Sequence, residues 1–238
     1  MCCAGTCRRP GFGLRSPAIG TLRREVLGFD VSAPGKIRTC DLPLRRRTLY
    51  PLSYGRGTLH DDRETTTQLI VQIAIISDTH MPRDRRRLPP ACQALLRESD
   101  LIVHAGDFAS LSVLHQLESY GAVVAVHGNV DDAGLRARLP STTLVEAGRA
   151  RIGLVHDAGP ARGRIARMRG LFPDAEAVVF GHSHLPLHDR APDGFQIFNP
   201  GSPTERRRAQ AHTMGLARVH GGRIDFELVT LVPAARPG

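Results

Sequence analysis

Short apolar runs recur along the chain from residue 69 onward, and stretches with helical spacing separate the first three of them. Leu69–Ser77 reads LIVQIAIIS, a β-branched run that is long enough for a buried strand and too short for a helix. Asp100–His104 and Ala122–His127 are of the same kind, whereas Ala91–Glu98 and Ser110–Tyr120 place apolar residues on one helical face. This alternation predicts parallel strand pairing with helical crossovers.

The second half of the chain continues the strand pattern with fewer helices. Further strands are expected at Thr142–Glu146, Arg151–His156, Ala177–Phe180 and Phe195–Phe198, with a helix near Gly163–Gly170. The end of the chain, Thr213–His220 and Arg223–Leu231, has the pattern of an antiparallel hairpin turning at two glycines. Together these elements predict an α/β fold with two sheets, in a domain that spans residues 69–238.

Residues 1–68 lack any sustained apolar period and are interrupted by many glycines and prolines, so we expect a disordered basic tail. Residues 1–66 carry 12 of the 32 basic and 6 of the 23 acidic residues, which is +6 of the net charge of +9. The high isoelectric point therefore belongs largely to this tail, and it is weak support for a nucleic-acid-binding domain.

Two other interpretations of this tail stay open. It could be a small basic appendage that orders on RNA or on an acidic surface. The stretch from Gly35 to Arg56 also resembles a conceptual translation across a transfer-RNA gene, in which case the natural chain would begin near Leu69 or Val71. If the tail is disordered, or if it is not part of the natural chain, it takes no part in the chemistry.

The overall composition, 41% hydrophobic and 23% charged, is ordinary for a globular domain. No run approaches the ~18–20 apolar residues that a membrane-spanning helix needs, so we expect no membrane partner. Five cysteines without regular spacing predict neither a disulfide framework nor a zinc knuckle, and we expect a cytoplasmic location. The sequence leaves the oligomeric state open, with a homodimer as one alternative.

Polar clusters rich in metal-ligand residues follow five of the predicted strands. They read Asp78-Thr79-His80, His104-Ala105-Gly106-Asp107, His127-Gly128-Asn129-Val130-Asp131, His156-Asp157 and Gly181-His182-Ser183-His184. Because the carboxyl ends of parallel strands open into one crevice, we expect these side chains to converge. Mixed carboxylate, amide and imidazole ligands suit Mn, Fe, Ni or Zn, and seven of them suit two ions that share a carboxylate.

Structural alternatives exist for most members of this set. Asp107 could cap the helix that follows it, and Asn129 and Asp131 could simply form a turn. We interpret His104 as a supporting residue, whereas His127 could contact a substrate phosphate or donate a proton. The glycines that precede three of the proposed ligands are expected at tight turns or close backbone approaches.

Taken in order, Asp-x-His, Gly-Asp, Gly-Asn, a lone His after a strand and Gly-His-x-His resemble the motifs of the calcineurin-like metallophosphoesterase superfamily. The segments HAGDF, GNVD, FGHSHLP and NPGSPTERR are similar to its small bacterial and archaeal phosphodiesterase branch. The resemblance covers roughly residues 71–232. It implies two mixed β-sheets packed as a sandwich and flanked by helices, in four layers α/β/β/α.

The resemblance also implies a function and a set of roles. Two divalent transition metal ions, manganese foremost with nickel, iron or zinc as alternatives, would hydrolyse a small phosphodiester through a metal-bound hydroxide. The first ion would be held by Asp78, His80 and His184, the second by Asn129, His156 and His182, and Asp107 would bridge both. Asp107 and His127 are the catalytic candidates. The alternatives are a phosphomonoesterase using the same site, or a non-catalytic binding scaffold of the same fold, as in the retromer subunit.

Two positions depart from the family pattern. Many relatives have a histidine where Val130 stands, and because valine can donate no proton, the general acid is unassigned. Asp157 stands where relatives commonly have glycine, and it could orient His156 or face solvent. The turn that starts at Asn199 is expected to be a plain turn, with Asn199 and Ser202 as further candidates beside the site.

Overall fold

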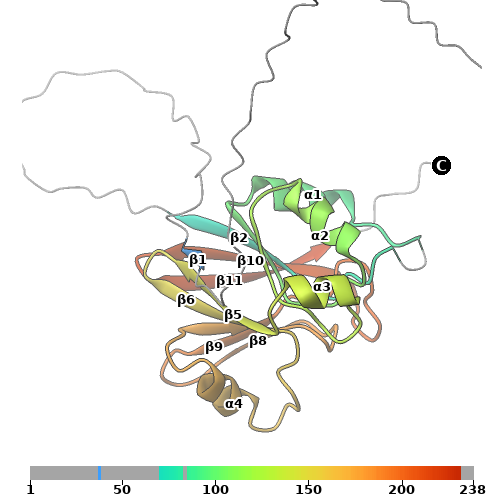
Figure 1. The fold of residues 1–238 in the computed structure, drawn as a ribbon. Helices are drawn as coiled ribbons and strands as arrows, with labels where there is room; N and C mark the ends of the chain where they lie inside the picture. The colour runs from blue at the N-terminus through green and yellow to red at the C-terminus, as the bar shows by residue number, and fades with distance from the viewer. Residues whose placement is uncertain (1–36, 39–69, 83–84, 232–238) are drawn as a thin grey trace, which may run out of the picture. The chain divides into compact units, whose positions relative to one another are not determined.

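The computed structural model describes residues 37–38, 70–82 and 85–231 (Figure 1). The predicted basic tail lies outside the described residues except for strand β1 (Ile37–Arg38), which pairs in parallel with strand β5 (Thr142–Ala147). Among the helices of the described part, none is both long and apolar enough to span a membrane.

The first sheet joins the early strands of the domain to the hairpin at its end. It contains β2 (Val71–Ile76), β3 (Leu101–His104), β4 (Val123–Ala125), β10 (His212–His220) and β11 (Arg223–Leu231). Its strand order is β11-β10-β2-β3-β4. The parallel pairing of β2, β3 and β4 and the antiparallel hairpin of β10 and β11 are both as predicted.

The second sheet has the order β1-β5-β6-β7-β9-β8 in the described residues. Its remaining members are β6 (Ala150–Val155), β7 (Ala177–Val179), β8 (Leu187–Arg190) and β9 (Gln196–Asn199). Strands β6, β7 and β9 run parallel, whereas β5 and β8 are antiparallel to their neighbours. Both sheets are therefore mixed.

Helices cover the outer face of each sheet (Figure 1). They are α1 (Pro90–Glu98), α2 (Leu111–Glu118), α3 (Ala133–Arg138) and α4 (Arg164–Leu171). Alternate residues of β2 enter different layers of the core, because side chains of a strand point to opposite faces. Ile73 and Ile75 pack with residues of the second sheet, whereas Ala74 and Ile76 pack with residues of α1 and α2. The predicted four-layer α/β/β/α sandwich is confirmed.

Besides β1, which lies in the segment expected to be disordered, two short elements were not predicted. Helix α3 has six residues with only Leu135 buried, so it shows too little apolar period to be detected, although Asp132 caps it by accepting from Leu135 N at 2.8 Å. Strand β8 reads LHDR and lies at the edge of its sheet with mostly exposed side chains, so no alternation marks it. Both elements are stabilised by tertiary context rather than by local pattern.

Candidate metal centre

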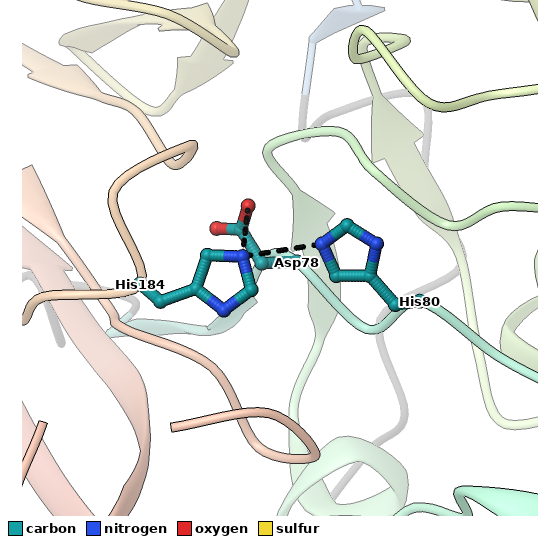
Figure 2. Close-up of side chains that lie close together, drawn as sticks. All are labelled: Asp78, His80 and His184. Carbon is teal, nitrogen blue, oxygen red and sulfur yellow. Dashed lines mark hydrogen bonds and ion pairs between the residues drawn. The ribbon is translucent and has the colours of Figure 1, made fainter. Parts of the chain in front are cut away.

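Asp78, His80 and His184 come together where strands β2 and β7 end. Each offers a ligand atom within 4.8 Å of the other two (Figure 2). The two Nε2 atoms lie 3.1 Å apart, and His184 Nε2 lies 3.4 Å from Asp78 Oδ1. Burial lowers the pKa of His80 to about 4 and also lowers the pKa of His184, so both rings are neutral at pH 7.

The hydrogen bonds of these rings fit a cation at their centre. His184 Nδ1 donates to the carbonyl oxygen of Glu205 at 2.6 Å, so its Nε2 carries the lone pair that points at His80. His80 Nδ1 is buried, and within the described residues it has no hydrogen-bond partner. Two neutral imidazole nitrogens and a carboxylate oxygen that converge in this way form a donor set typical of transition metal sites.

A second group lies beside the first and contains Asp107, His156 and His182. His156 Nδ1 donates to the carbonyl oxygen of Ala105 at 2.7 Å, which leaves its Nε2 free to bind. That Nε2 is 3.1 Å from Asn129 Oδ1 and 3.3 Å from Asp107 Oδ2, and His182 Nδ1 is 3.0 Å from Asn129 Oδ1. Asn129 and His182 are exposed, so this group opens to solvent.

Asp107 connects the two groups through one oxygen atom. Its Oδ2 lies 3.3 Å from His156 Nε2 and 3.6 Å from His80 Nε2, while its Oδ1 accepts from Val130 N at 3.0 Å. Burial opposes ionisation of this carboxyl, but the hydrogen bond and charge of His156 outweigh it and hold the pKa at about 2. Asp107 is therefore an anion placed where a bridging ligand is needed.

Asp78, the other carboxyl of the centre, has its pKa raised where that of Asp107 is lowered. Burial raises the pKa of Asp78 to about 7, since no water reaches the group to solvate its charge. Burial also opposes the charge on His156, but the hydrogen bond to Asp107 outweighs it and raises the pKa of that ring. The centre thus retains protons near neutral pH that a cation would displace.

The backbone is strained at most of the proposed ligands. In the described part of the chain eight residues other than glycine have a positive φ, and five of them are Asp78, His80, Asp107, His182 and His184. This conformation costs an L-residue roughly 1–2 kcal/mol. Such strain clusters at functional sites, where the surrounding structure holds it in place.

Asp131 and Gly128 hold the loops that carry Asp107 and Asn129. The Asp131 carboxylate accepts from three backbone nitrogens, those of Asp107 at 3.2 Å, Ala109 at 2.8 Å and Gly128 at 2.7 Å. A Cβ atom at Gly128 would collide with the backbone nitrogen and the carboxylate of Asp107. The close backbone approach predicted for this glycine is confirmed.

The turn after β9 supports the first ligand group, so it is more than the plain turn that we expected. Ser202 Oγ donates to the carbonyl oxygen of Asp78 at 2.8 Å, and Thr204 Oγ1 donates to that of Thr79 at 2.6 Å. Asn199 Nδ2 donates to the carbonyl oxygen of Gly181 at 2.8 Å. Strand β9 is parallel to β7, so the strand-end rule extended to β9 would have pointed to this loop.

Two other histidines lie outside both ligand groups. His104 is buried, its Nδ1 accepts from Gly106 N at 3.1 Å, and its Nε2 lies 3.1 Å from Thr79 Oγ1. This placement supports the interpretation of His104 as a supporting residue. His127 is half-buried, and its Nδ1 lies 3.3 Å from the carbonyl oxygen of Gly128. Its catalytic role stays a prediction.

The structural alternatives for two acidic residues are also decided by their contacts. Helix α2 begins at Leu111 after the cap residue Ser110, so Asp107 does not cap it. Asp157 is exposed and accepts from Gly159 N at 2.7 Å. The carbonyl oxygen of Ala105, and not Asp157, orients the His156 ring by accepting from its Nδ1. Asp157 faces solvent instead.

Comparison with known proteins places this architecture in a class. The model of the calcineurin-like phosphoesterase superfamily domain matches residues 71–222. The chain is also 36% identical, over 168 residues, to a "Probable metallophosphoesterase" of Methanothermobacter thermautotrophicus, with 69% of this chain and 95% of that protein covered. The fold is that of phosphoesterases, and the chain carries two groups of residues that could hold metal ions. The chain belongs to the calcineurin-like phosphoesterase superfamily, whose members bind divalent metals.

Solved structures show the same fold. The protein TM1076 of Thermotoga maritima is 28% identical with a TM-score of 0.55, covering 68% of this chain and 99% of that one. Vacuolar protein sorting 29 of Cryptosporidium parvum has a TM-score of 0.57 at 18% identity, covering 68% and 98%. The second likeness concerns the fold alone.

Proposed function

We propose that this protein is a dinuclear metal-dependent phosphodiesterase. The observation that carries the proposal is the position of Asp107 Oδ2, within 3.6 Å of the facing imidazole nitrogen in each ligand group. The first ion would be held by Asp78, His80 and His184, the second by Asn129, His156 and His182, and both by Asp107. When bound, a pair of divalent ions lowers the pKa of water to supply a nucleophile and offsets charge on the phosphate oxygens.

The chain's own groups prepare this site before substrate arrives. Backbone carbonyls of Ala105 and Glu205 hold the Nδ1–H tautomers of His156 and His184, so that both Nε2 lone pairs stay directed inward. The exposed side chains of Asn129 and His182 leave an open side of the second group, through which a phosphate ester can enter. Nitrogen and oxygen donors in this mixture suit manganese, and nickel, iron and zinc are alternatives.

The resemblance to the phosphodiesterase branch supports a diester over a monoester. Arg86 Nη2 and Arg207 Nε lie 3.2 and 3.7 Å from Glu205 Oε1, so this carboxylate offsets one of the two guanidinium charges. A monoester is a dianion near neutral pH and gains most from additional cations, whereas a diester carries one charge. The substrate that this setting supports best is a small phosphodiester.

A reconstitution screen tests the proposal. The protein would be loaded with Mn²⁺, Ni²⁺, Fe²⁺, Zn²⁺ or Mg²⁺ and assayed with bis(p-nitrophenyl) phosphate and p-nitrophenyl phosphate. We expect faster turnover of the diester with Mn²⁺, loss of that turnover in Asp107→Asn, and no change in the control Asp157→Asn. Faster turnover of the monoester would indicate a phosphomonoesterase, and no turnover of either ester by the metal-loaded protein would indicate a binding scaffold.

A further inference from the structure

Glu205 lies beside the first ligand group, although no strand-end motif pointed to it. Its Oε2 is 3.7 Å from His80 Nε2, almost the same as the 3.6 Å between that nitrogen and Asp107 Oδ2. Its side chain is 24% exposed, and its backbone carbonyl accepts from His184 Nδ1. One residue thus contacts two of the three proposed ligands of this group, one through its side chain and one through its backbone.

Both the backbone and the carboxylate of Glu205 are held in place by hydrogen bonds or ion pairs. Its backbone nitrogen donates to Ser202 Oγ at 2.9 Å, and that hydroxyl donates to the carbonyl oxygen of Asp78. Arg86 contacts both carboxylate oxygens, with Nη2 at 3.2 Å from Oε1 and Nη1 at 3.3 Å from Oε2. The carboxylate therefore lies between a guanidinium group on one side and an imidazole of the metal centre on the other.

We propose that Glu205 is a further oxygen ligand of the first metal ion, and that Arg86 competes with the ion for its carboxylate. The inference rests on the proposed dinuclear centre. With Glu205 included, the first site offers two imidazoles and three carboxylates, whereas the second offers two imidazoles, one amide oxygen and the shared carboxylate. Because carboxylate oxygens suit Mn²⁺, the first site is the tighter manganese site of the two.

Manganese titration of three variants tests this assignment. In Glu205→Gln the affinity for one of the two ions should fall about 10–100-fold, the range found when groups supporting a metal site are removed. In Arg86→Gln the same affinity should rise, because the competing cation is gone. The matched control is Glu227→Gln, which removes a carboxylate paired at 2.9 Å with Arg218 on the terminal hairpin and should leave both affinities unchanged.

The titration would use calorimetry together with electron paramagnetic resonance of free Mn²⁺, and circular dichroism would check that each variant is folded. A Co²⁺-loaded sample adds a second readout, since loss of a ligand changes the visible absorption of one ion, whereas a merely loosened loop would not.

The outcomes separate this inference from the proposed function. If the wild-type protein binds two ions and Glu205→Gln gives the same isotherm and the same Co²⁺ spectrum, the assignment of Glu205 is wrong and the dinuclear centre stands. If Arg86→Gln weakens binding, the competition between Arg86 and the ion is wrong. A wild-type protein that binds fewer than two ions would overturn the dinuclear centre and this inference together.

Discussion

Asp131 offers the most specific test of how the loops of the metal centre are held. Its Oδ2 accepts from the backbone nitrogens of Gly128 and Asp107, and its Oδ1 accepts from that of Ala109. Asp131→Asn keeps the shape of the side chain but replaces one acceptor oxygen with an NH₂ group, which cannot accept. The variant therefore leaves at least one backbone N–H in this loop without its partner.

The size of the effect follows from which oxygen is lost. An amide that turns its NH₂ toward Ala109 loses one hydrogen bond, and the other orientation loses two, so the first is preferred. One buried N–H left unpaired costs roughly 1–3 kcal/mol, which is the expected fall in the free energy of unfolding. The affinity for Mn²⁺ should fall about 10–100-fold, because the lost bond at Ala109 loosens the loop that carries Asp107.

The assay is guanidinium chloride unfolding of the metal-free variant followed by Mn²⁺ titration. The neighbouring residue supplies the control, since Asp132→Ala removes only the cap of α3 at Leu135 N and should cost about 1 kcal/mol without changing metal affinity. If Asp131→Asn binds Mn²⁺ as tightly as Asp132→Ala does, the role assigned to Asp131 is refuted.

Three further predictions concern protonation, backbone fit and the leaving group. Below their raised pKa values Asp78 and His156 hold protons that compete with metal, so affinity should rise as the pH passes about 7, the pKa of Asp78, and should level off once both groups have lost their protons. Calorimetry in buffers of different ionisation enthalpy should then find more protons released on metal binding at pH 6 than at pH 9, and a flat profile would contradict the assignment. Gly128→Ala should lose Mn²⁺ binding because its Cβ collides with Asp107, whereas Gly170→Ala, with open space around its Cβ, should bind normally; equal binding by both would refute the steric argument. Aryl diesters should be hydrolysed faster than alkyl diesters, since Val130 cannot protonate a poor leaving group and general acids typically supply ~10²–10⁴-fold. Comparable rates on both classes would mean that another group donates, and His127→Ala would then show whether it is His127.

The layers of this fold could be predicted because the core is built from strands that are buried on both faces. Ile73 and Ile75 on one face of β2 and Ala74 and Ile76 on the other make a continuous apolar run that is visible without any structure. Strand β8 lacks such a signal because it lies at an edge, and helix α3 lacks it because it buries a single leucine.

The candidate site was predictable to the extent that its residues follow parallel strands. The structure brings six of the seven predicted ligands into two groups and places Asn129 next to the second of them. The place of Asp131 in a strand-end cluster was visible in the sequence, but its bonds to Asp107 and Ala109 and the position of Glu205 beside His80 depend on contacts between loops that are distant in sequence. The cytoplasmic location and the dispensable tail stay predictions, and the oligomeric state stays open.

The most direct test of the dinuclear centre is a crystal of the Mn²⁺-saturated protein, with anomalous scattering measured at the manganese edge and elemental analysis of the same sample. The account predicts two ions per chain, one bound by Asp78, His80 and His184, the other by Asn129, His156 and His182, with Asp107 contacting both. A single ion, ions bound elsewhere, or no manganese under saturating conditions would contradict it.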